Sequence, residues 1–379
     1  MAIWANRHIM FVQAFGIAFL THLLLFSIAP MASMLMQEMH LSNTQFGLAF
    51  SVTVISLILF RVPWGLLADR KGYVRVLRIA LLLATIAAFL RSVVQDYSGL
   101  LVGQFLLGLG LAAILPGLSV MVKDCARERL GFGTGVYVAG FAAGNATALG
   151  AIPLVLNVLE WREAFLLCAC FSAVICLVWW LTSNSTGRVG VAFRLEHSGG
   201  LLRDGHVWLL LCLLAAAAGG FDTLANWMPR VLEMKLINPS LSFLLPVGFF
   251  LAGPVVGLAA DRIPSRRNLV ALLGLVATSS ILGIMLAPLP LLLPSLVTAG
   301  FATMGVFVIG LTQPLEDARL SPYAGTVVGF ISSLACVGSL AMPVLFGFLI
   351  DVTGMYHTSL ASVAIIVGAA FIGGSRLMR

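Results

Sequence analysis

The stretch 65–75 reads Gly65-Leu-Leu-Ala-Asp69-Arg70-Lys-Gly72-Tyr-Val-Arg75 and joins two long apolar runs. A similar pattern returns at 257–267 as Gly257-Leu-Ala-Ala-Asp261-Arg262-Ile-Pro-Ser-Arg266-Arg267. The matching glycines, aspartates and first arginines are each 192 residues apart. A charged turn that occurs twice in an apolar chain predicts a duplicated membrane protein.

Composition places the chain in a membrane. Hydrophobic residues make up 60% of the 379 residues and charged residues only 10%, whereas soluble proteins carry about 25% charged residues. The mean hydropathy is +1.05. Because lipid cannot satisfy backbone hydrogen bonds, such a chain must form helices or a closed barrel. We expect an all-α integral membrane protein.

Twelve apolar runs are long enough to cross a bilayer, which takes about 20 residues. They fall at 9–35, 44–68, 75–95, 97–122, 131–157, 162–182, 206–232, 240–260, 266–287, 289–313, 323–350 and 356–376. The break between the ninth and tenth runs is short, Ala287-Pro-Leu-Pro290, so ten or eleven helices remain the alternative.

Lysine and arginine placement predicts the orientation. With both termini in the cytoplasm, 17 of the 22 basic residues lie on the cytoplasmic side, as the positive-inside rule requires. Arg91, Arg162, Arg230 and Lys235 are expected on the opposite side. The net charge of +7 therefore fits membrane topology and not nucleic-acid binding. A multi-pass protein of an inner (plasma) membrane is the expected localisation.

The two halves repeat at one register. Ala126-Arg127 with Gly133-Thr134 recurs 192 residues later as Ala318-Arg319 with Gly325-Thr326. Parallel repeats of this kind are related by an axis along the membrane normal. We expect an N-terminal six-helix bundle over 1–182, a glycine-bearing cytoplasmic linker over 183–205 and a C-terminal six-helix bundle over 206–379.

The loop between the second and third runs resembles the characteristic loop of the major facilitator superfamily. The resemblance extends over the whole chain and implies twelve helices and transport by alternating access. It also implies that Asp69, Arg70 and Arg75 hold the halves together on the cytoplasmic side in one conformation. Independently, Gly65 allows close helix approach and Gly72 a tight turn. The alternative is that the basic residues are only positive-inside anchors. The corresponding set in the second loop is Gly257, Asp261, Arg262 and Arg266.

Three ionisable residues lie clearly within the apolar runs: His22, Arg61 and Asp222. Charges at this depth cost at least about 2.5–3.5 kcal/mol and usually face a cavity or pathway. The Arg61 guanidinium can bind an oxyanion through two parallel hydrogen bonds. Its alternative role is to extend toward the cytoplasmic interface.

The run Arg61-Val-Pro63-Trp-Gly65 resembles the second span of the nitrate/nitrite porters, and this implies that Arg61 binds an anion. The run Gly140-Phe-Ala-Ala-Gly144-Asn145 loosely resembles the glycine–asparagine run of the same family. Two departures from the pattern of the nitrate/nitrite porters leave the identity of the anion undetermined. Gly253 stands at the repeat position of Arg61, and Cys336-Val337 stands where Gly144-Asn145 would recur. Cyanate-permease-like and monocarboxylate carriers therefore remain alternatives.

His22 and Asp222 lie at similar expected depths in the first and seventh runs. Helical rise places Arg61 about 10 Å closer to the cytoplasm. We expect His22 and Asp222 to form or flank an outer gate or a proton site, since histidine titrates near neutral pH. The alternatives are a hydrogen bond from His22 to a neighbouring helix and simple closeness of Asp222 to the outer surface.

Weaker candidates for the substrate site are polar residues within the runs, which are more often packing residues: Gln104, Asn145, Asn226 and Trp227. The six cysteines lack zinc-ligand spacing. Because no nucleophile–base pair and no phosphate-binding loop is evident, we expect neither an enzyme nor an ATP-driven pump, and no cofactor or metal.

The expected function is a secondary active transporter of a small solute, with an anion such as nitrate, nitrite or a small carboxylate as the first choice. The alternatives are an efflux carrier for organic or drug-like compounds and a non-transporting scaffold or sensor on the same fold. The expected partners are the solute, a coupled proton or counter-transported ion and the lipid bilayer, without nucleic acid. A monomer is expected.

Overall fold

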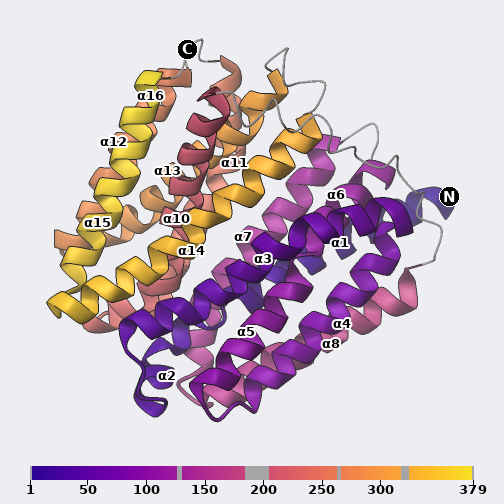
Figure 1. Cartoon of the computed structure of the whole chain (residues 1–379), viewed down its shortest axis with the longest axis horizontal. Coiled ribbons are helices and arrows are strands. Elements are labelled where there is room, and N and C mark those ends of the chain that lie inside the picture. Colours follow the sequence, from indigo (N-terminus) through magenta and orange to yellow (C-terminus); the bar gives the residue numbers. More distant parts are fainter. Residues whose placement is uncertain (1, 126–129, 184–204, 263–265, 317–323, 378–379) are drawn as a thin grey trace. The chain divides into compact units, whose positions relative to one another are not determined.

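The structure, a computed structural model, describes residues 2–125, 130–183, 205–262, 266–316 and 324–377. All regular secondary structure in these ranges is helical (Figure 1). The first half contains α1 (Ala2–Phe26), η1 (Ala29–Met31), α2 (Ala32–Glu38), α3 (Asn43–Lys71), α4 (Tyr73–Ser92), α5 (Tyr97–Leu111), α6 (Ile114–Cys125), α7 (Leu130–Val155) and α8 (Trp161–Thr182). The second half contains α10 (Gly205–Met234), η3 (Pro239–Phe243), α11 (Leu244–Arg262), α12 (Arg266–Leu286), α13 (Leu289–Glu316), α14 (Ala324–Thr353), α15 (Tyr356–Gly368), η5 (Ala369–Gly373) and α16 (Gly374–Leu377).

Twelve helical segments within the described ranges are long and apolar enough to cross a membrane. The first, 9–38, joins α1, η1 and α2, and the fourth, 97–122, joins α5 and α6. The short break between the ninth and tenth predicted runs is present in the structure, because α12 ends at Leu286 and α13 begins at Leu289. The predicted twelve-helix, all-α membrane architecture is confirmed.

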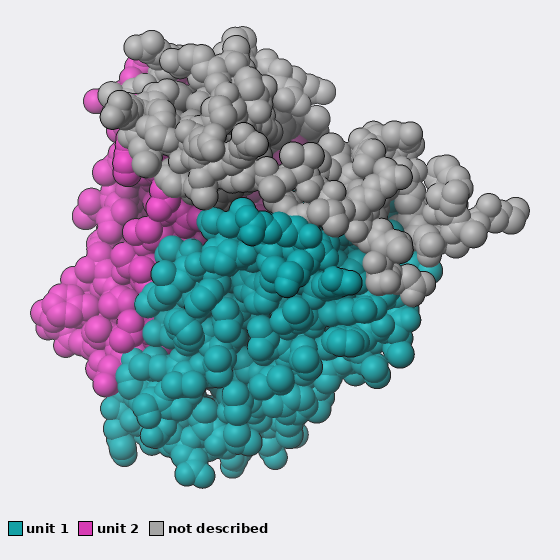
Figure 2. Space-filling view, turned by 45° about the vertical axis from the view of Figure 1, so that its right-hand side comes forward, with its two compact units in different colours: residues 1–41, 52–193 teal, residues 42–51, 194–379 magenta. Residues whose placement is uncertain are grey.

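The described chain forms two compact units, coloured separately in Figure 2. One unit contains residues 1–41 and 52–193, and the other contains 42–51 and 194–379. The first residues of α3 therefore pack with the second unit, although the rest of α3 belongs to the first. The predicted linker, 183–205, lies almost entirely outside the described residues, so the proposed domain boundaries stay a prediction.

In the first unit, α1 packs along α7, and α4 packs on α5 and α8. Glycines on α7 set the spacing of the first pair. A Cβ atom at Gly140 would lie 2.6 Å from Phe15 O, and one at Gly144 only 2.0 Å from Phe19 O. Side chains at these two places would collide with the α1 backbone, so glycine is what allows the two helices to touch.

The second unit repeats this packing, with α10 on α14, α11 on α13, and α12 on α13 and α15. One close contact in the first unit has its equivalent in the second unit at matching residues. A Cβ at Gly108 would lie 2.3 Å from Thr53 O, and one at Gly300 would lie 2.0 Å from Leu245 O. Both members of the second pair stand 192 residues after those of the first. The internal repeat is therefore visible in the packing of α3 on α5 and of α11 on α13.

Elsewhere the matching contacts are not separated by a constant 192 residues. In α14 it is Gly338 that approaches the first helix of its unit, since a Cβ there would lie 1.9 Å from Ala215 O. Gly338 therefore does for α10 what Gly144 does for α1, although Cys336 occupies the position 192 residues after Gly144. The eleventh span does have its close-approach glycine, two residues later than a constant offset predicts.

Candidate functional site

The charged turn joins α3 to α4. Gly72 adopts a φ of 83° and its N–H donates to Ala68 O at 2.9 Å, so the chain reverses at a residue without a Cβ. Gly65 lies on α3 with a Cβ position 3.7 Å from Pro116 Cβ. Arg70 and Arg75 are exposed. In the second turn Arg266 is half-buried at the start of α12. The side chains of Asp69, Asp261 and Arg262 and the surroundings of Gly257 lie outside the described residues.

Two of the predicted site residues belong to the first unit. His22 on α1 and Arg61 on α3 are both half-buried. The Nδ1 atom of His22 is buried without a hydrogen-bond partner among the described residues. The expectation that Arg61 lies about 10 Å closer to the cytoplasm than His22 stays a prediction.

Aromatic rings from α7 surround the imidazole. Phe141 lies 4.5 Å from His22 between ring centroids, and Tyr137 contacts Phe141 edge-on at 5.9 Å. Phe26, one turn along α1, lies 5.6 Å from His22. An apolar wall of this kind strengthens any electrostatic interaction that Arg61 makes.

Asn145 is fully buried on α7, one residue after the glycine that touches α1. Neither its amide nitrogen nor its amide oxygen has a hydrogen-bond partner among the described residues. Buried polar groups are nearly always satisfied by protein, water or ligand. Asn145 therefore has two unused hydrogen-bonding atoms with which it could contact a polar solute.

The second unit has a similar feature on α10. Asn226 is fully buried, and both atoms of its amide lack a partner among the described residues. Thr223, one turn earlier, is also fully buried, and its hydroxyl lacks a described partner. Residues three apart share a helix face, so the pair forms a polar patch. Sequence reasoning missed Thr223 because threonine is common in membrane helices. Asp222, the remaining ionisable candidate, is half-buried beside this patch.

Trp227 serves helix packing. Its ring stacks on Phe346 at 5.3 Å and contacts Phe46 edge-on at 5.2 Å. The indole N–H donates to Pro343 O at 3.0 Å. Since tryptophan has a single hydrogen-bonding group, that group is already used. We therefore assign Trp227 to the α10–α14 contact and leave it out of the proposed site.

Arg91 is a further buried ionisable residue. It was expected near the outer end of its span, and it lies at the end of the span 73–92 and is only 1% exposed. Its guanidinium donates to Leu24 O at 3.1 Å and Ser27 Oγ at 2.9 Å, and it lies 4.1 Å from the Phe165 ring centroid. It fastens α1 to α4 and α8, so a fourth ionisable residue is buried in the spans. Gln104 is also buried, next to the α5 glycine Gly103 that packs on Arg91.

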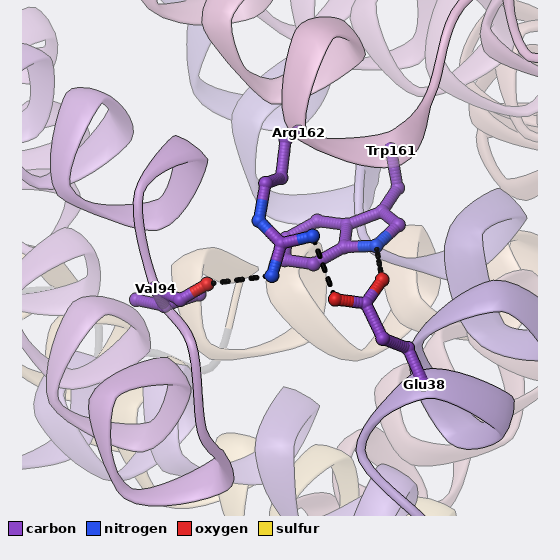
Figure 3. Close-up of polar contacts among 4 residues, drawn as sticks. All are labelled: Glu38, Val94, Trp161 and Arg162. Carbon is purple, nitrogen blue, oxygen red and sulfur yellow. Dashed lines mark hydrogen bonds and ion pairs between the residues drawn. The ribbon is translucent and has the colours of Figure 1, made fainter.

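Glu38, Val94, Trp161 and Arg162 form a cluster of polar contacts in the first unit (Figure 3). The Glu38 carboxylate pairs with Arg162 Nη1 at 2.6 Å and accepts a hydrogen bond from Trp161 Nε1 at 2.6 Å. Arg162 also donates to Val94 O at 3.2 Å, with its guanidinium 4.1 Å from the Trp161 ring centroid. The cluster joins α2, the α4–α5 turn and the start of α8. Its half-exposed position indicates a structural role.

In the second unit, Asp351 near the end of α14 caps the start of α3. One carboxylate oxygen accepts from the Asn43 N–H and from Asn43 Nδ2, both at 2.8 Å. The other accepts from the Thr44 N–H at 2.7 Å and the Thr44 hydroxyl at 2.5 Å. A carboxylate at a helix N-terminus satisfies backbone donors and complements the helix dipole. No sequence pattern indicated this pair, because 307 to 308 residues separate its members.

The helix packing and the repeated charged turn agree with the family comparison. The model of the Major Facilitator Superfamily matches residues 14–343. The chain belongs to this superfamily. Together with the twelve spans described above, membership makes it a multi-pass membrane protein and a transporter of small solutes, as predicted, and not an enzyme.

Curated relatives in this superfamily are distant. The nitrite extrusion protein of Bacillus subtilis (strain 168) is 25% identical over 91% of this chain and 88% of its own. The 2-nitroimidazole transporter of Escherichia coli (strain K12) is 25% identical over 89% and 87%. The probable nitrate/nitrite antiporter NarK1 of Thermus thermophilus is 23% identical over 89% and 84%. The predicted resemblance to nitrate/nitrite porters is confirmed at this low identity.

A solved structure shares the fold. It is a bacterial homologue of the human lysosomal transporter Spinster, solved in an inward-facing and unoccupied conformation. It superimposes with a TM-score of 0.76 at 16% identity, over 98% of this chain and 97% of that one. At this identity the likeness concerns the fold alone.

Proposed function

We propose that this transporter is a secondary active carrier for a small anion and that Arg61 contacts the negative charge. The observation that carries the proposal is that Arg61 and His22, a cation and a titratable ring, both lie half-buried within apolar spans of the first unit. A charge at that depth is costly and usually marks a substrate or ion pathway. The names of the nitrite and nitrate relatives support an anion.

The proposed mechanism is rocker-switch alternating access, in which two six-helix halves rock about a midplane site. The halves are 1–182 and 206–379, joined by a linker over 183–205, with both termini in the cytoplasm of an inner membrane. The charged turns would form the cytoplasmic gate, with Asp69, Arg70 and Arg75 in the first turn and Asp261, Arg262 and Arg266 in the second. We propose that the carrier works as a monomer.

Asn145, Asn226 and Thr223 are proposed to supply neutral hydrogen bonds to the solute at some stage of the cycle. Gln104 stays a weaker candidate for the same role. An efflux carrier for organic compounds is the second candidate function, because one relative is a 2-nitroimidazole transporter. A panel of nitrite, nitrate, benzoate and 2-nitroimidazole therefore separates the two candidates.

Changing Arg61 to alanine should abolish anion uptake in proteoliposomes. A charge-assisted hydrogen bond contributes about 1.5–3 kcal/mol, which corresponds to roughly a 10- to 150-fold loss of affinity. Lysine at this position should restore part of the uptake, because it keeps the charge and loses the two-pronged geometry. Arg376→Ala, at an exposed position on α16, is the control. Wild-type uptake of every anion by R61A would contradict the assignment.

Coupling to protons should depend on His22. The nearest described ring to its imidazole is that of Phe141, which Tyr137 contacts edge-on, and the charged candidate in the same unit is Arg61 on α3. We expect an acidic exterior to change the rate of anion uptake by wild-type protein. H22Q should lose this dependence and keep anion exchange at equal pH on both sides. Asp222→Asn tests the other candidate in the same assay. A pH-independent rate in the wild type would remove the coupling role of both residues.

A further inference from the structure

A hollow of about 370 Å³ lies in the first unit, where α4 ends and α5 begins. The end of α4 and the turn after it contribute Leu90, Val93 and Val94 to its lining, and α5 contributes Gly99, Val102 and Gly103. The spans 73–92 and 97–122 end and begin here. The hollow, which we call the α4–α5 groove, therefore lies at a membrane boundary.

Two glycines one turn apart on α5 contribute no side chain to the groove. A Cβ at Gly99 would lie 2.9 Å from Asp96 Oδ1 and 3.4 Å from Val94 Cγ1. A Cβ at Gly103 would lie 3.0 Å from Arg91 Cγ. Small residues allow helices to approach closely, so these glycines bring α5 against the end of α4 and leave the space beside it open.

The walls of the groove are apolar and exposed. Leu90, Val93 and Val102 have exposed fractions of 40%, 67% and 59%. The span 73–92 has 20 residues, which is about the length needed to cross the hydrocarbon core. The side chains near its end therefore lie at the level where acyl chains meet headgroups, and the groove is open to lipid.

Asp96 gives the groove a polar end. It is the N-cap of α5, lies outside both spans and is exposed. Among the described residues that line the groove, it carries the only charge. Its carboxylate accepts from Gly99 N–H at 2.8 Å and from Ser98 Oγ at 2.9 Å, and these bonds lower its pKa, so it is ionised at neutral pH. A carboxylate has about four lone-pair sites, so it can accept from a further cationic donor.

A cation reaches the same turn from α8. The Arg162 guanidinium donates to Val94 O at 3.2 Å while it pairs with Glu38 (Figure 3). A guanidinium has five N–H donors, so these two contacts leave others. The turn after α4 thus has a carboxylate and a guanidinium beside an apolar groove. This pattern complements an amphiphile whose headgroup carries both an ammonium and a phosphate.

We propose that the α4–α5 groove binds a phospholipid with a primary ammonium headgroup, such as an ethanolamine phospholipid. The ammonium donates to Asp96, and the phosphate lies toward Arg162. An acyl chain covers the apolar walls at Leu90, Val93 and Val102. A trimethylammonium headgroup has no N–H to donate, and an anionic headgroup is repelled by the carboxylate, so the site distinguishes among bilayer lipids. This lipid site is separate from Arg61 and does not rest on the proposed function.

Native mass spectrometry of the purified full-length carrier in detergent tests the headgroup. The probes are 1-palmitoyl-2-oleoyl phospholipids with ethanolamine, choline or glycerol headgroups. We expect wild-type protein to bind the ethanolamine lipid about threefold or more tightly than the choline and glycerol lipids. Asp96→Asn should remove this preference, because asparagine still caps a helix but carries no charge. Glu163→Gln is the matched control, since Glu163 is exposed and accepts from Glu160 N–H at 3.0 Å, a bond that glutamine can keep.

Val102→Trp tests the groove itself. The indole should fill the space and lower binding of the ethanolamine lipid by about threefold or more, because the acyl chain loses its apolar contacts. Val174→Trp on α8 is the matched control, since Val174 is 56% exposed in the same unit and lies outside the described lining of the groove. Thermal unfolding of each variant in detergent verifies folding.

Loss of the headgroup preference in D96N, weaker binding in V102W and wild-type binding in both controls would support the site. Equal affinity of wild-type protein for the ethanolamine and choline lipids would overturn it. Unchanged binding of the ethanolamine lipid in either D96N or V102W would overturn it as well. A lipid-free dimer that V102W dissociates would assign this surface to a second copy of the chain and also overturn the proposal.

Discussion

Leucine in place of Gly144 is expected to separate α1 from α7 and leave little folded protein. A Cβ at this position would lie 2.0 Å from Phe19 O and 2.8 Å from the carbonyl carbon of the same residue. These are backbone atoms of a long helix, so they cannot rotate away as a side chain could. Overpacking costs about 1–3 kcal/mol and occasionally more, and a backbone collision belongs at the upper end of that range. Size-exclusion chromatography and thermal unfolding in detergent measure the effect.

The matched control lies on the same helix. Gly135 is exposed on α7, and a Cβ there would meet no described atom within 4 Å. Gly135→Leu should therefore unfold at nearly the wild-type temperature. Gly338→Leu should reproduce the defect in the second unit, because its Cβ would lie 1.9 Å from Ala215 O. A monodisperse G144L protein with wild-type thermal stability would show that the α1–α7 contact is not as close as described.

Removing the Asp351 carboxylate should destabilise the start of α3. Asp351→Ala leaves four donors of Asn43 and Thr44 without their acceptor. Loss of a helix cap costs about 0.5–2 kcal/mol, and we expect the upper end because two backbone and two side-chain donors are affected together. Asp351→Asn keeps one acceptor oxygen and should lose about half as much. Thermal unfolding of the purified protein measures both variants.

Asp96 provides the comparison for this prediction. It caps α5 by accepting from Gly99 N–H at 2.8 Å and from Ser98 Oγ at 2.9 Å, and these bonds hold the pKa of its carboxyl below the usual value. All of its partners lie within three residues, so Asp96→Ala should affect only the local helix end. Asp351 instead joins two segments that are far apart in the chain. If D351A is no less stable than D96A, the cap does not hold the start of α3 to α14.

The sequence predicted the architecture correctly because the relevant information is local. Each span is an apolar run of bilayer length, and the repeated turn revealed the duplication. The same local reading selected Arg61 and His22 as site candidates, since an ionisable residue within an apolar run is conspicuous wherever the helix lies, and their role stays a prediction. The tight turn at Gly72 was also predicted from the sequence, and the structure gives this residue a φ of 83°, which a residue without a Cβ adopts with little strain.

Sequence patterns could not give the contacts that long-range packing decides. Arg91 was expected near the outer end of its span, and only the structure shows that Leu24 O and Ser27 Oγ accept from its buried guanidinium. Trp227 was a weak cavity candidate, and only the structure shows that Pro343 O accepts its N–H. The close-approach glycine of the eleventh span was not found, because a constant offset misses a two-residue slip in helix packing.

The sequence by itself determined that this chain crosses the membrane twelve times in two repeats and carries few charges in its spans. Hydrophobic length and residue spacing suffice for that, because they act along one helix at a time. Only the tertiary structure decided that Asp351 caps α3, that Leu24 O and Ser27 Oγ accept from the buried Arg91, and that Gly338 approaches α10. These relations join separate helices, and their geometry depends on side-chain reach, helix tilt and packing register.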